Sequence, residues 1–499
     1  MSELMDLTGR RLAEAIRVGE ASAVEATEAA LERIERRDGA LAAFVRVTPE
    51  LALAQARAAD RLLAAAGDGP VPPLLGVPVP IKDLNMVAGL PMAAGSAALA
   101  DFVAPVDDGV VTLLREAGTV MVGKTATPEL GLPPYTETDI APPVRNPWDE
   151  TRSPGGSSGG AAAAVAGGMV PIAQGSDGGG SIRIPAAACG LVGLKPSRGR
   201  ISTGPNGVDG AALATSGVLT RDVRDTALAL DVLARPWPGD DRLLPRPAAG
   251  SFLAACDTDP GPLRVGVVLT PFITPDAPVH PEAIRAVEKT IALLEARGHR
   301  VEQVGVPFPA EQWQPFKDVW SVMAAQAPIP PEREHLLVPL TRWMRERGRG
   351  VGGVAYANAI ANGQQLQRQA ASAWADVDLV LSPTLAQPAA PIGSIRNDAD
   401  PARDFEDQCA YTPWTSTWNI LGAPAISLPV HRARVGGGEA GPAEPAEPVE
   451  RAGPVEPAEP AEPAGPMLPF GAMLGARTGR EDLLLALAAS LEPDFAPGS

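Results

Sequence analysis

The sequence SPGGSSGG at residues 153–160, followed by GSDGGGSIRIP at residues 175–185, is the most distinctive stretch of this 499-residue chain. Successive glycines let a backbone approach a ligand closely and adopt dihedral angles closed to other residues. The backbone N–H groups of such a run can converge on one point and bind the oxyanion of a tetrahedral intermediate. We therefore predict an active-site loop that ends in a serine nucleophile. The N–H groups of this loop that we expect to bind the oxyanion belong to Gly178, Gly179, Gly180 and Ser181.

A flexible glycine-serine linker is the alternative interpretation of this segment. The glycines, however, lie among apolar residues, and a linker has no need of the charged pair Asp177 and Arg183. These two side chains can form an ion pair that braces the loop. The sequence therefore favours an ordered loop.

A serine nucleophile needs a base. The GxSxG pattern at residues 155–159 follows a polar loop instead of the strand that a nucleophile elbow requires. The histidines also lie outside any concentrated motif, so a Ser-His-Asp triad is poorly supported. Lysine is the other candidate, provided that burial lowers its pKa towards neutrality. Lys82, within the apolar, proline-rich sequence GVPVPIKDL at residues 76–84, suits this role best.

The sequence GTVMVGKT at residues 118–125 fits the phosphate-loop pattern GxxxxGKT. Its intervening residues prefer an extended strand, whereas a phosphate loop must turn its N–H groups inward. Pro128 also prevents a helix from following directly. We therefore expect no nucleotide site here.

Composition excludes several classes of protein. The formal net charge of −17 argues against nucleic-acid binding, which requires clustered lysine and arginine. No apolar run is long enough to span a membrane, and the N-terminus lacks the pattern of a signal peptide. Three distant cysteines give no disulfide framework and no metal motif, so a reduced cytoplasm is the expected location.

The order of predicted elements indicates an α/β fold. The first 66 residues predict helices, with Thr8 and Ser22 as N-caps. From about residue 70, short β-type runs alternate with loops and helices. The predicted strands include residues 118–123, 263–269 and 377–381, and residues 169–173 form a further short apolar run. The predicted helices include 161–166, 282–298 and most of 308–376.

These blocks together resemble the amidase-signature enzymes, over nearly the whole chain. The central blocks are residues 154–160, 175–183 and 193–196, and residues 76–83 and 422–429 support them. The sequence KPSRGRIS further resembles members that act on linear or cyclic ω-amino-acid oligoamides, such as 6-aminohexanoate cyclic-dimer hydrolases. The resemblance implies a mixed central sheet flanked by helices.

The resemblance also implies a Ser-Ser-Lys triad composed of Lys82, Ser157 and Ser181. Lys82 would take a proton from Ser157, which would take one from the nucleophile Ser181. The N–H groups of residues 178–181 would stabilise the oxyanion of the resulting intermediate. The peptide bond between Gly156 and Ser157 is expected to be cis.

Other residues are expected to have supporting roles. The pair Asp177 and Arg183 would brace the loop, and Ser158 and Ser176 would form hydrogen bonds around the triad. No metal and no cofactor are implied. Lys124 and Lys195 are expected to be structural, and the candidates for the substrate pocket are Tyr135, Trp414 and Trp418. Glycine at position 178, where the family often has a larger residue, is expected to loosen the loop.

The implied function is hydrolysis of a small primary or secondary carboxamide to an acid and ammonia or an amine, through a serine acyl-enzyme. Two other functions remain open: the amidase subunit of a tRNA-dependent amidotransferase, and a non-catalytic binding protein on the same fold. The expected partner is a small-molecule amide, with no nucleic acid and no membrane. The sequence leaves open whether the chain forms a homo-oligomer.

The expected organisation is one large amidase domain with an insertion. Residues 436–466 contain PAEPAEP twice and few bulky apolar residues, which predicts a disordered loop between two neighbouring strands. A loop of this length adds little closure entropy. The predicted parts are the amidase domain 1–435, with helices 1–66, catalytic core 70–235 and a helical excursion at 280–376 that shapes the pocket, and the closing strand and helix at 467–499.

Overall fold

The computed structural model describes residues 2–67, 69–208, 210–436 and 465–495. An eight-stranded mixed sheet forms its centre, with the strand order β4-β6-β5-β10-β11-β9-β7-β8. The three strands β9, β7 and β8 are parallel, and the remaining neighbours are antiparallel. The strands are β4 (Ile172–Asp177), β5 (Val192–Lys195), β6 (Thr215–Thr220), β7 (Arg264–Val267), β8 (Arg300–Gln303), β9 (Leu379–Pro383), β10 (Ala425–Arg434) and β11 (Met467–Ala476).

A second, three-stranded sheet has the order β1-β3-β2. It consists of β1 (Phe44–Val47), β2 (Ile81–Lys82) and β3 (Gly123–Thr125). β2 runs parallel to β3 and pairs Lys82 with Thr125. All residues of β2 and β3 are buried, so this small sheet places Lys82 in the interior.

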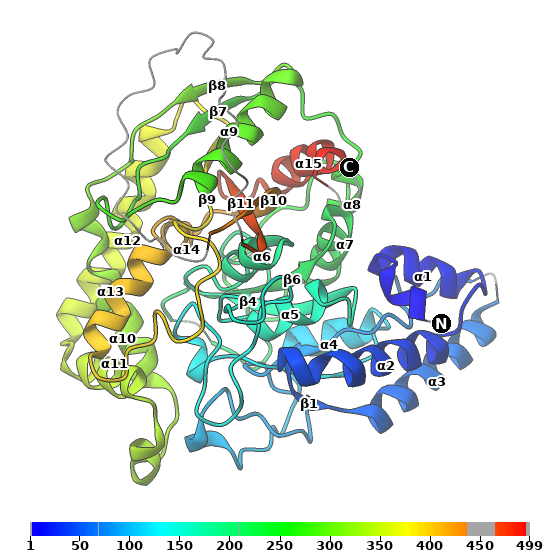
Figure 1. The fold of residues 1–499 in the computed structure, drawn as a ribbon. Coiled ribbons are helices and arrows are strands. Elements are labelled where there is room, and N and C mark those ends of the chain that lie inside the picture. The colour runs from blue at the N-terminus through cyan, green and yellow to red at the C-terminus, as the bar shows by residue number, and fades with distance from the viewer. Residues whose placement is uncertain (1, 68, 209, 437–464, 496–499) are drawn as a thin grey trace.

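Helices cover both faces of the central sheet (Figure 1). α9 and α15 lie on one side of β10 and β11, and α6 lies on the other. The α-helices are α1 (Gly9–Arg17), α2 (Ala23–Leu41), α3 (Pro49–Ala66), α4 (Gly109–Glu116), α5 (Gly159–Ala166), α6 (Arg183–Cys189), α7 (Val223–Leu233), α8 (Phe252–Ala255), α9 (Pro281–Ala296), α10 (Phe316–Gln326), α11 (Pro339–Gly350), α12 (Gly353–Ala373), α13 (Pro401–Tyr411), α14 (Thr415–Leu421) and α15 (Glu481–Leu491).

Strands at the centre of the sheet are apolar because both of their faces are covered. β9 is buried along its whole length, and β11 is buried from its second residue onward. Continuous apolar runs of this kind are typical of sheets that lie between two helical layers. The observed mixed sheet with flanking helices confirms the predicted fold class.

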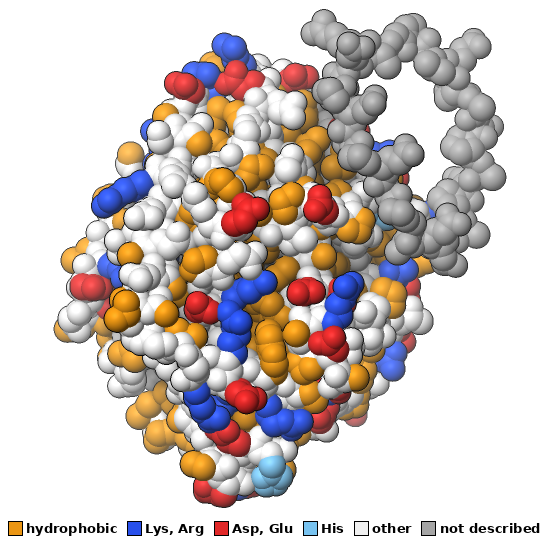
Figure 2. Space-filling model, turned by 90° about the vertical axis from the view of Figure 1, so that its left-hand side faces the viewer, with side chains coloured by type: hydrophobic (Ala, Val, Ile, Leu, Met, Phe, Trp, Pro, Cys, Tyr) orange, Lys and Arg blue, Asp and Glu red, His pale blue; other side chains and the backbone are white. Residues whose placement is uncertain are grey.

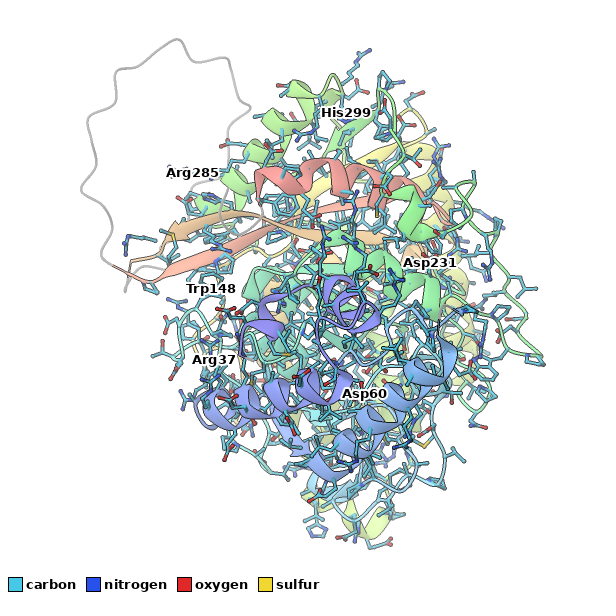
Figure 3. The ribbon with its side chains drawn as sticks, turned by 90° about the vertical axis from the view of Figure 1, so that its right-hand side faces the viewer. Arg37, Asp60, Trp148, Asp231, Arg285 and His299 are labelled. Carbon is cyan, nitrogen blue, oxygen red and sulfur yellow. The ribbon has the colours of Figure 1, made fainter. Side chains whose placement is uncertain are left out.

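The N-terminal helices begin at the predicted caps. The Thr8 side chain accepts a hydrogen bond from the Arg11 N–H, and Ser22 forms a complete capping box with Glu25. Asp60 of α3 also accepts the Ala23 N–H at 2.7 Å, which ties α3 to the start of α2 (Figure 3). Capping residues of this kind typically stabilise a helix by about 1 kcal/mol.

One predicted strand is wrong in its extent. The sequence predicts a strand over residues 118–123, but the regular strand starts only at Gly123, and Val120 forms an isolated bridge with Pro78. The neighbouring segment contains Pro78 and Pro80, which have no N–H to donate to a ladder. Proline therefore interrupts the pairing until β2 begins. In the residues that the structure describes, no helix is long and apolar enough to cross a membrane.

β10 and β11 form the antiparallel hairpin that carries the predicted insertion. Their pairing extends to Arg434 opposite Met467, and the Val435 N–H donates to the Pro466 carbonyl oxygen at 3.1 Å. The two strands are therefore neighbours, as expected. The predicted disorder of residues 436–466 falls almost entirely on residues 437–464, which lie outside the described part of the chain.

Since the ends of β10 and β11 already meet, the connection between them should be replaceable. We predict that exchanging residues 437–464 for Asn-Gly, a dipeptide suited to tight hairpins, leaves the fold intact. The shorter connection lowers the loop-closure entropy, which should stabilise the protein by about 1–2 kcal/mol at most. Thermal unfolding should show an equal or slightly higher midpoint. A clearly lower midpoint would contradict the independence of the hairpin from this segment.

Candidate active site

Lys82 lies in a small polar cage inside the protein. Its side chain is fully buried, and its Nζ lies 2.8 Å from Ser157 Oγ, 2.9 Å from Ser158 Oγ and 3.1 Å from Ser176 Oγ. The Gln174 side-chain oxygen accepts the Lys82 backbone N–H at 3.0 Å and holds β2 against β4. All three partners of Nζ are hydroxyl groups, so no carboxylate contacts the ammonium directly.

Burial lowers the pKa of Lys82 to about 7, although the Asp177 carboxylate acts in the opposite direction. Removal of the ammonium from water favours the neutral amine, because a charged group is poorly solvated in the interior. An amine with a pKa near neutrality can serve as a general base. The environment of Lys82 thus meets the requirement that the sequence analysis set for a lysine base.

Ser157 and Ser181 lie on two adjoining segments. Ser157 precedes α5, and the peptide bond between Gly156 and Ser157 is cis, as predicted. Ser181 lies between β4 and α6, and its carbonyl oxygen accepts the Ser158 N–H at 3.2 Å. Within the described residues no hydrogen bond joins the Oγ atoms of Ser157 and Ser181. The structure therefore brings Lys82 and Ser157 into direct contact and connects Ser181 to them through the backbone.

Asp177 holds the glycine loop in place. Its carboxylate accepts hydrogen bonds from Arg183 Nε at 2.9 Å and Nη2 at 3.0 Å, and both side chains are fully buried. Asn419 Nδ2 also donates to Asp177 Oδ1, at 2.9 Å. Burial opposes the ionisation of Asp177, but the Arg183 guanidinium, Lys195 and the Asn419 amide together outweigh it and lower the pKa of the carboxyl to about 2. The predicted bracing ion pair is present.

The glycine run supplies fewer free amides than predicted. The Gly180 N–H donates to Asp177 Oδ1 at 2.8 Å, so it is directed away from any substrate. The N–H groups of Gly178, Gly179 and Ser181 have no acceptor among the described residues. The expectation that all four amides stabilise an oxyanion is therefore wrong for Gly180, because the bracing carboxylate uses that donor.

A pocket that is open to solvent lies at Ser181. None of its lining side chains is charged. Trp313, Phe316 and Trp320 form a stacked row along one wall, with ring centroids 4.9 and 5.4 Å apart. The other lining residues are Leu132, Pro133, Pro134, Gly179, Ile184, Ile273, Phe405, Gln408, Cys409, Thr412 and Ser416.

The three aromatic residues predicted for the pocket lie elsewhere. Tyr135 is buried and donates its hydroxyl to Asp404 Oδ2 at 2.8 Å. Trp414 is fully buried and donates to the Thr270 carbonyl oxygen, and Trp418 stacks against Trp374 at 5.8 Å. These side chains fill the core, which is the commoner role of aromatic residues.

The row of Trp313, Phe316 and Trp320 is the part of the pocket that the sequence analysis missed. Phe316 and Trp320 are four positions apart and share one face of α10, and Trp313 lies three positions earlier, at the end of a 3₁₀ helix (Ala310–Trp313). That spacing was a usable signal. Gln408 and Ser416 carried no such signal, because they belong to α13 and α14, more than 200 residues from the nucleophile loop.

The lysines predicted to be structural have protein partners. Lys124 forms a buried ion pair with Asp83 at 2.9 Å and donates to the Asn85 carbonyl oxygen. Lys195 donates to the Pro196 carbonyl oxygen at 2.7 Å. Lys124 is the lysine of the phosphate-loop pattern, and its buried pairing leaves no cation for a phosphate at that position.

The amidase family model matches residues 25–485 of this chain. The chain belongs to the amidase-signature family. A Synechocystis sp. protein named "Putative amidase" is 38% identical over 435 residues, which cover 86% of this chain and 83% of that protein. Amide hydrolysis is the general chemistry that membership supports.

Two further similarities bear on the kind of amidase. A solved structure of 6-aminohexanoate cyclic dimer hydrolase complexed with substrate superposes with a TM-score of 0.83, at 30% identity over 99% of this amidase and 98% of that chain. A glutamyl-tRNA(Gln) amidotransferase subunit of Chromohalobacter salexigens is 33% identical over 85% of this chain and 90% of its own length.

Neighbouring glycines of the loop should differ sharply in their tolerance of a methyl group. Gly180 has φ of +135°, and an added Cβ would lie 2.6 Å from Ile184 Cδ1 and Thr415 Oγ1. Gly179 would have no atom closer than 3.9 Å. We predict that Gly180→Ala destabilises the protein by about 1–3 kcal/mol, whereas Gly179→Ala changes stability by less than about 1 kcal/mol. Denaturant unfolding of the two variants measures this difference, and equal values would contradict it.

Proposed function

We propose that this protein hydrolyses a small uncharged carboxamide through an acyl-enzyme on Ser181, with Lys82 as the base and Ser157 as the proton carrier between them. The observation that carries the proposal is the position of a fully buried lysine, with a pKa of about 7, at 2.8 Å from Ser157 Oγ. Burial alone does not distinguish Lys82 from Lys124 and Lys195, but the Nζ of Lys82 contacts only hydroxyl groups, and one of them is the Ser157 Oγ that could pass a proton to it.

The hydroxyl groups around Lys82 orient its lone pair. Ser158 Oγ donates to the Ser176 carbonyl oxygen at 3.2 Å, so towards Lys82 it acts as an acceptor. A neutral amine has two N–H donors and one lone pair. If Ser158 and Ser176 accept the two N–H groups, the lone pair faces Ser157. Lys82 then removes the Ser157 proton as Ser157 removes the proton of Ser181.

The reaction that follows is acyl transfer. Ser181 Oγ attacks the amide carbonyl carbon, and the oxyanion is stabilised by the N–H groups of Gly178, Gly179 and Ser181. Donors of this type contribute about 3–4 kcal/mol each in other serine hydrolases. The proton returns through Ser157 to the leaving nitrogen, and the C–N bond breaks. A water molecule then hydrolyses the acyl-enzyme by the same proton path.

The lining of the Ser181 pocket favours an uncharged substrate. Free glutamine, which an amidotransferase subunit would use as its ammonia donor, carries an ammonium and a carboxylate. A charged group in an apolar pocket needs an opposite charge, and the lining residues offer none. The uncharged lining therefore weighs against the amidotransferase function. The Lys82 environment weighs against a non-catalytic binding protein.

The direct test is turnover of an amide panel, measured by release of ammonia or amine. The panel should contain aliphatic, aryl and cyclic amides together with free glutamine. Turnover of neutral amides without glutaminase activity is the expected result. Glutaminase activity with no turnover of neutral amides would instead favour the amidotransferase function.

Removal of the nucleophile or of the base should abolish acylation. We predict that a fluorophosphonate probe labels the wild-type protein and fails to label Ser181→Ala. Lys82→Met should lower kcat/KM by about 10²–10⁴-fold, which is the usual contribution of a general base. Circular dichroism of both variants is the control for folding. Labelling of folded Ser181→Ala at the wild-type rate would refute the assignment of the nucleophile.

The pH dependence of acylation should report the ionisation of Lys82. Only the neutral amine accepts a proton, and burial lowers its pKa to about 7. We therefore predict that kcat/KM rises with pH through about 7 and becomes constant above it. An inflection near the ordinary lysine pKa of about 10 would show that the base is not a buried lysine.

A further inference from the structure

Gln408 of α13 presents a fixed acceptor to the Ser181 pocket. The side chain is only 5% exposed and lines the pocket. Its Nε2 donates to Asp404 Oδ1 at 2.6 Å, and no donor among the described residues reaches its Oε1. Oε1 does not occur among the fully buried side-chain atoms that lack a partner, and Gln408 lines the pocket.

Asp404 determines which end of the Gln408 amide faces the pocket. Its other oxygen, Oδ2, accepts the Tyr135 hydroxyl at 2.8 Å and the Asn397 N–H at 2.9 Å. A carboxylate that accepts these bonds has only acceptor capacity left for Gln408. The Nε2 group of Gln408 must therefore point to Asp404, and the carbonyl oxygen must point away from it.

Ser416 of α14 presents the complementary group, a hydroxyl donor. The Trp313 indole N–H donates to Ser416 Oγ at 3.1 Å, which uses an acceptor site of the hydroxyl and fixes its position. No acceptor for the Ser416 proton occurs in the described part of the chain. By contrast, the Thr412 hydroxyl in the same pocket donates to the backbone carbonyl oxygen of Gln408 at 2.8 Å, so its proton is already used.

We propose that Gln408 and Ser416 bind a second, non-scissile amide group of the substrate. Gln408 Oε1 accepts the N–H of that group, and the Ser416 hydroxyl donates to its carbonyl oxygen. One acceptor and one donor in an otherwise apolar, uncharged pocket match the hydrogen-bonding pattern of a neutral amide. The substrate class is therefore a neutral compound with at least two amide groups. This inference rests on the proposed amide hydrolysis and adds the residues that set its specificity.

Two series of three matched p-nitroanilides test the second amide. Each has the same chain length and differs only at one internal linkage, which is an amide, an ester or a methylene pair. One series has this linkage on the acyl side of the anilide, and a second series has it on the amine side. We expect the amide probe to exceed the ester and methylene probes in kcat/KM by about tenfold or more in one series, because an unpaired buried acceptor is unfavourable. Release of the chromophore measures cleavage of the anilide, and mass spectrometry identifies any cleavage of the ester.

Asp404→Asn reverses the polarity of Gln408 without altering the atoms of the pocket. The oxygen of the introduced amide must remain at the Tyr135 and Asn397 donors, so its nitrogen takes the place of Oδ1. Gln408 then turns its Oε1 towards that nitrogen and its NH₂ towards the pocket. The preference for the amide over the ester probe should fall by about tenfold, since the ester oxygen can accept from NH₂. A loss of packing alone would lower the rates of all three probes equally.

Side-chain removal provides the second arm. Gln408→Met and Ser416→Ala should each lower kcat/KM for the amide probe by about tenfold, with a much smaller effect on the methylene probe. Thr412→Val is the matched control, because its hydroxyl proton is already bound to the protein. In this variant the ratio between the probes should stay at the wild-type value, whatever the change in the absolute rates.

The probe and variant measurements have outcomes that would contradict the second-amide subsite. Equal rates for amide and methylene probes in both series, or an unchanged preference in Asp404→Asn, would overturn it. A fall of Ser416→Ala activity on all probes alike would remove Ser416 from the proposed subsite. Failure of the proposed function has a different signature, namely no anilide cleavage and no fluorophosphonate labelling of the wild-type protein.

Discussion

The buried carboxylate of Asp177 is the constraint on which the candidate active site depends. It terminates β4, accepts both nitrogens of the Arg183 fork at the start of α6, and holds Asn419 of α14. The same carboxylate takes the N–H groups of Gly180 and Ile182. The consecutive elements β4 and α6 and the distant helix α14 are thereby fixed around one loop, and the N–H groups of Gly178, Gly179 and Ser181 in that loop have no acceptor among the described residues. Removal of either partner of such a buried pair would leave an uncompensated charge in the interior.

Lys82 and Lys195 show how the surroundings decide the role of a buried lysine. Burial lowers the pKa of both groups to about 7. Lys195 donates to the carbonyl oxygen of its neighbour Pro196, whereas Lys82 meets three hydroxyl groups, among them that of Ser157. A lowered pKa is therefore a property of depth, and only the partners of Nζ make it useful for proton transfer.

The surface over α10–α13 carries separate positive and negative side chains among apolar ones, so no single-sign field there would attract a charged substrate (Figure 2).

The sequence predicted the parts of the protein that local chemistry specifies. The capped helices, the fold class and the contact between Lys82 and the serine-rich segment follow from residues close together in sequence, or from a motif that names them. Gly180 could not be interpreted correctly, because its donor is used by a carboxylate whose orientation only the folded loop defines. The pocket was also missed, since its walls come from α10, α13 and α14, which meet only in the tertiary structure. Trp414 and Trp418 lie near these walls in sequence but face the core.

The closed end of the β10–β11 hairpin has an evolutionary consequence. Strand pairing is complete at Arg434 and Met467, and the Val435 N–H already meets the Pro466 carbonyl oxygen. The pairing of these two strands therefore sets no requirement on the length or composition of the chain between these points. Such a position accepts foreign sequence in natural and engineered proteins alike. The hairpin tip is thus an insertion site, at which a binding peptide, a reporter or a whole second domain could be added while the rest of the fold is kept.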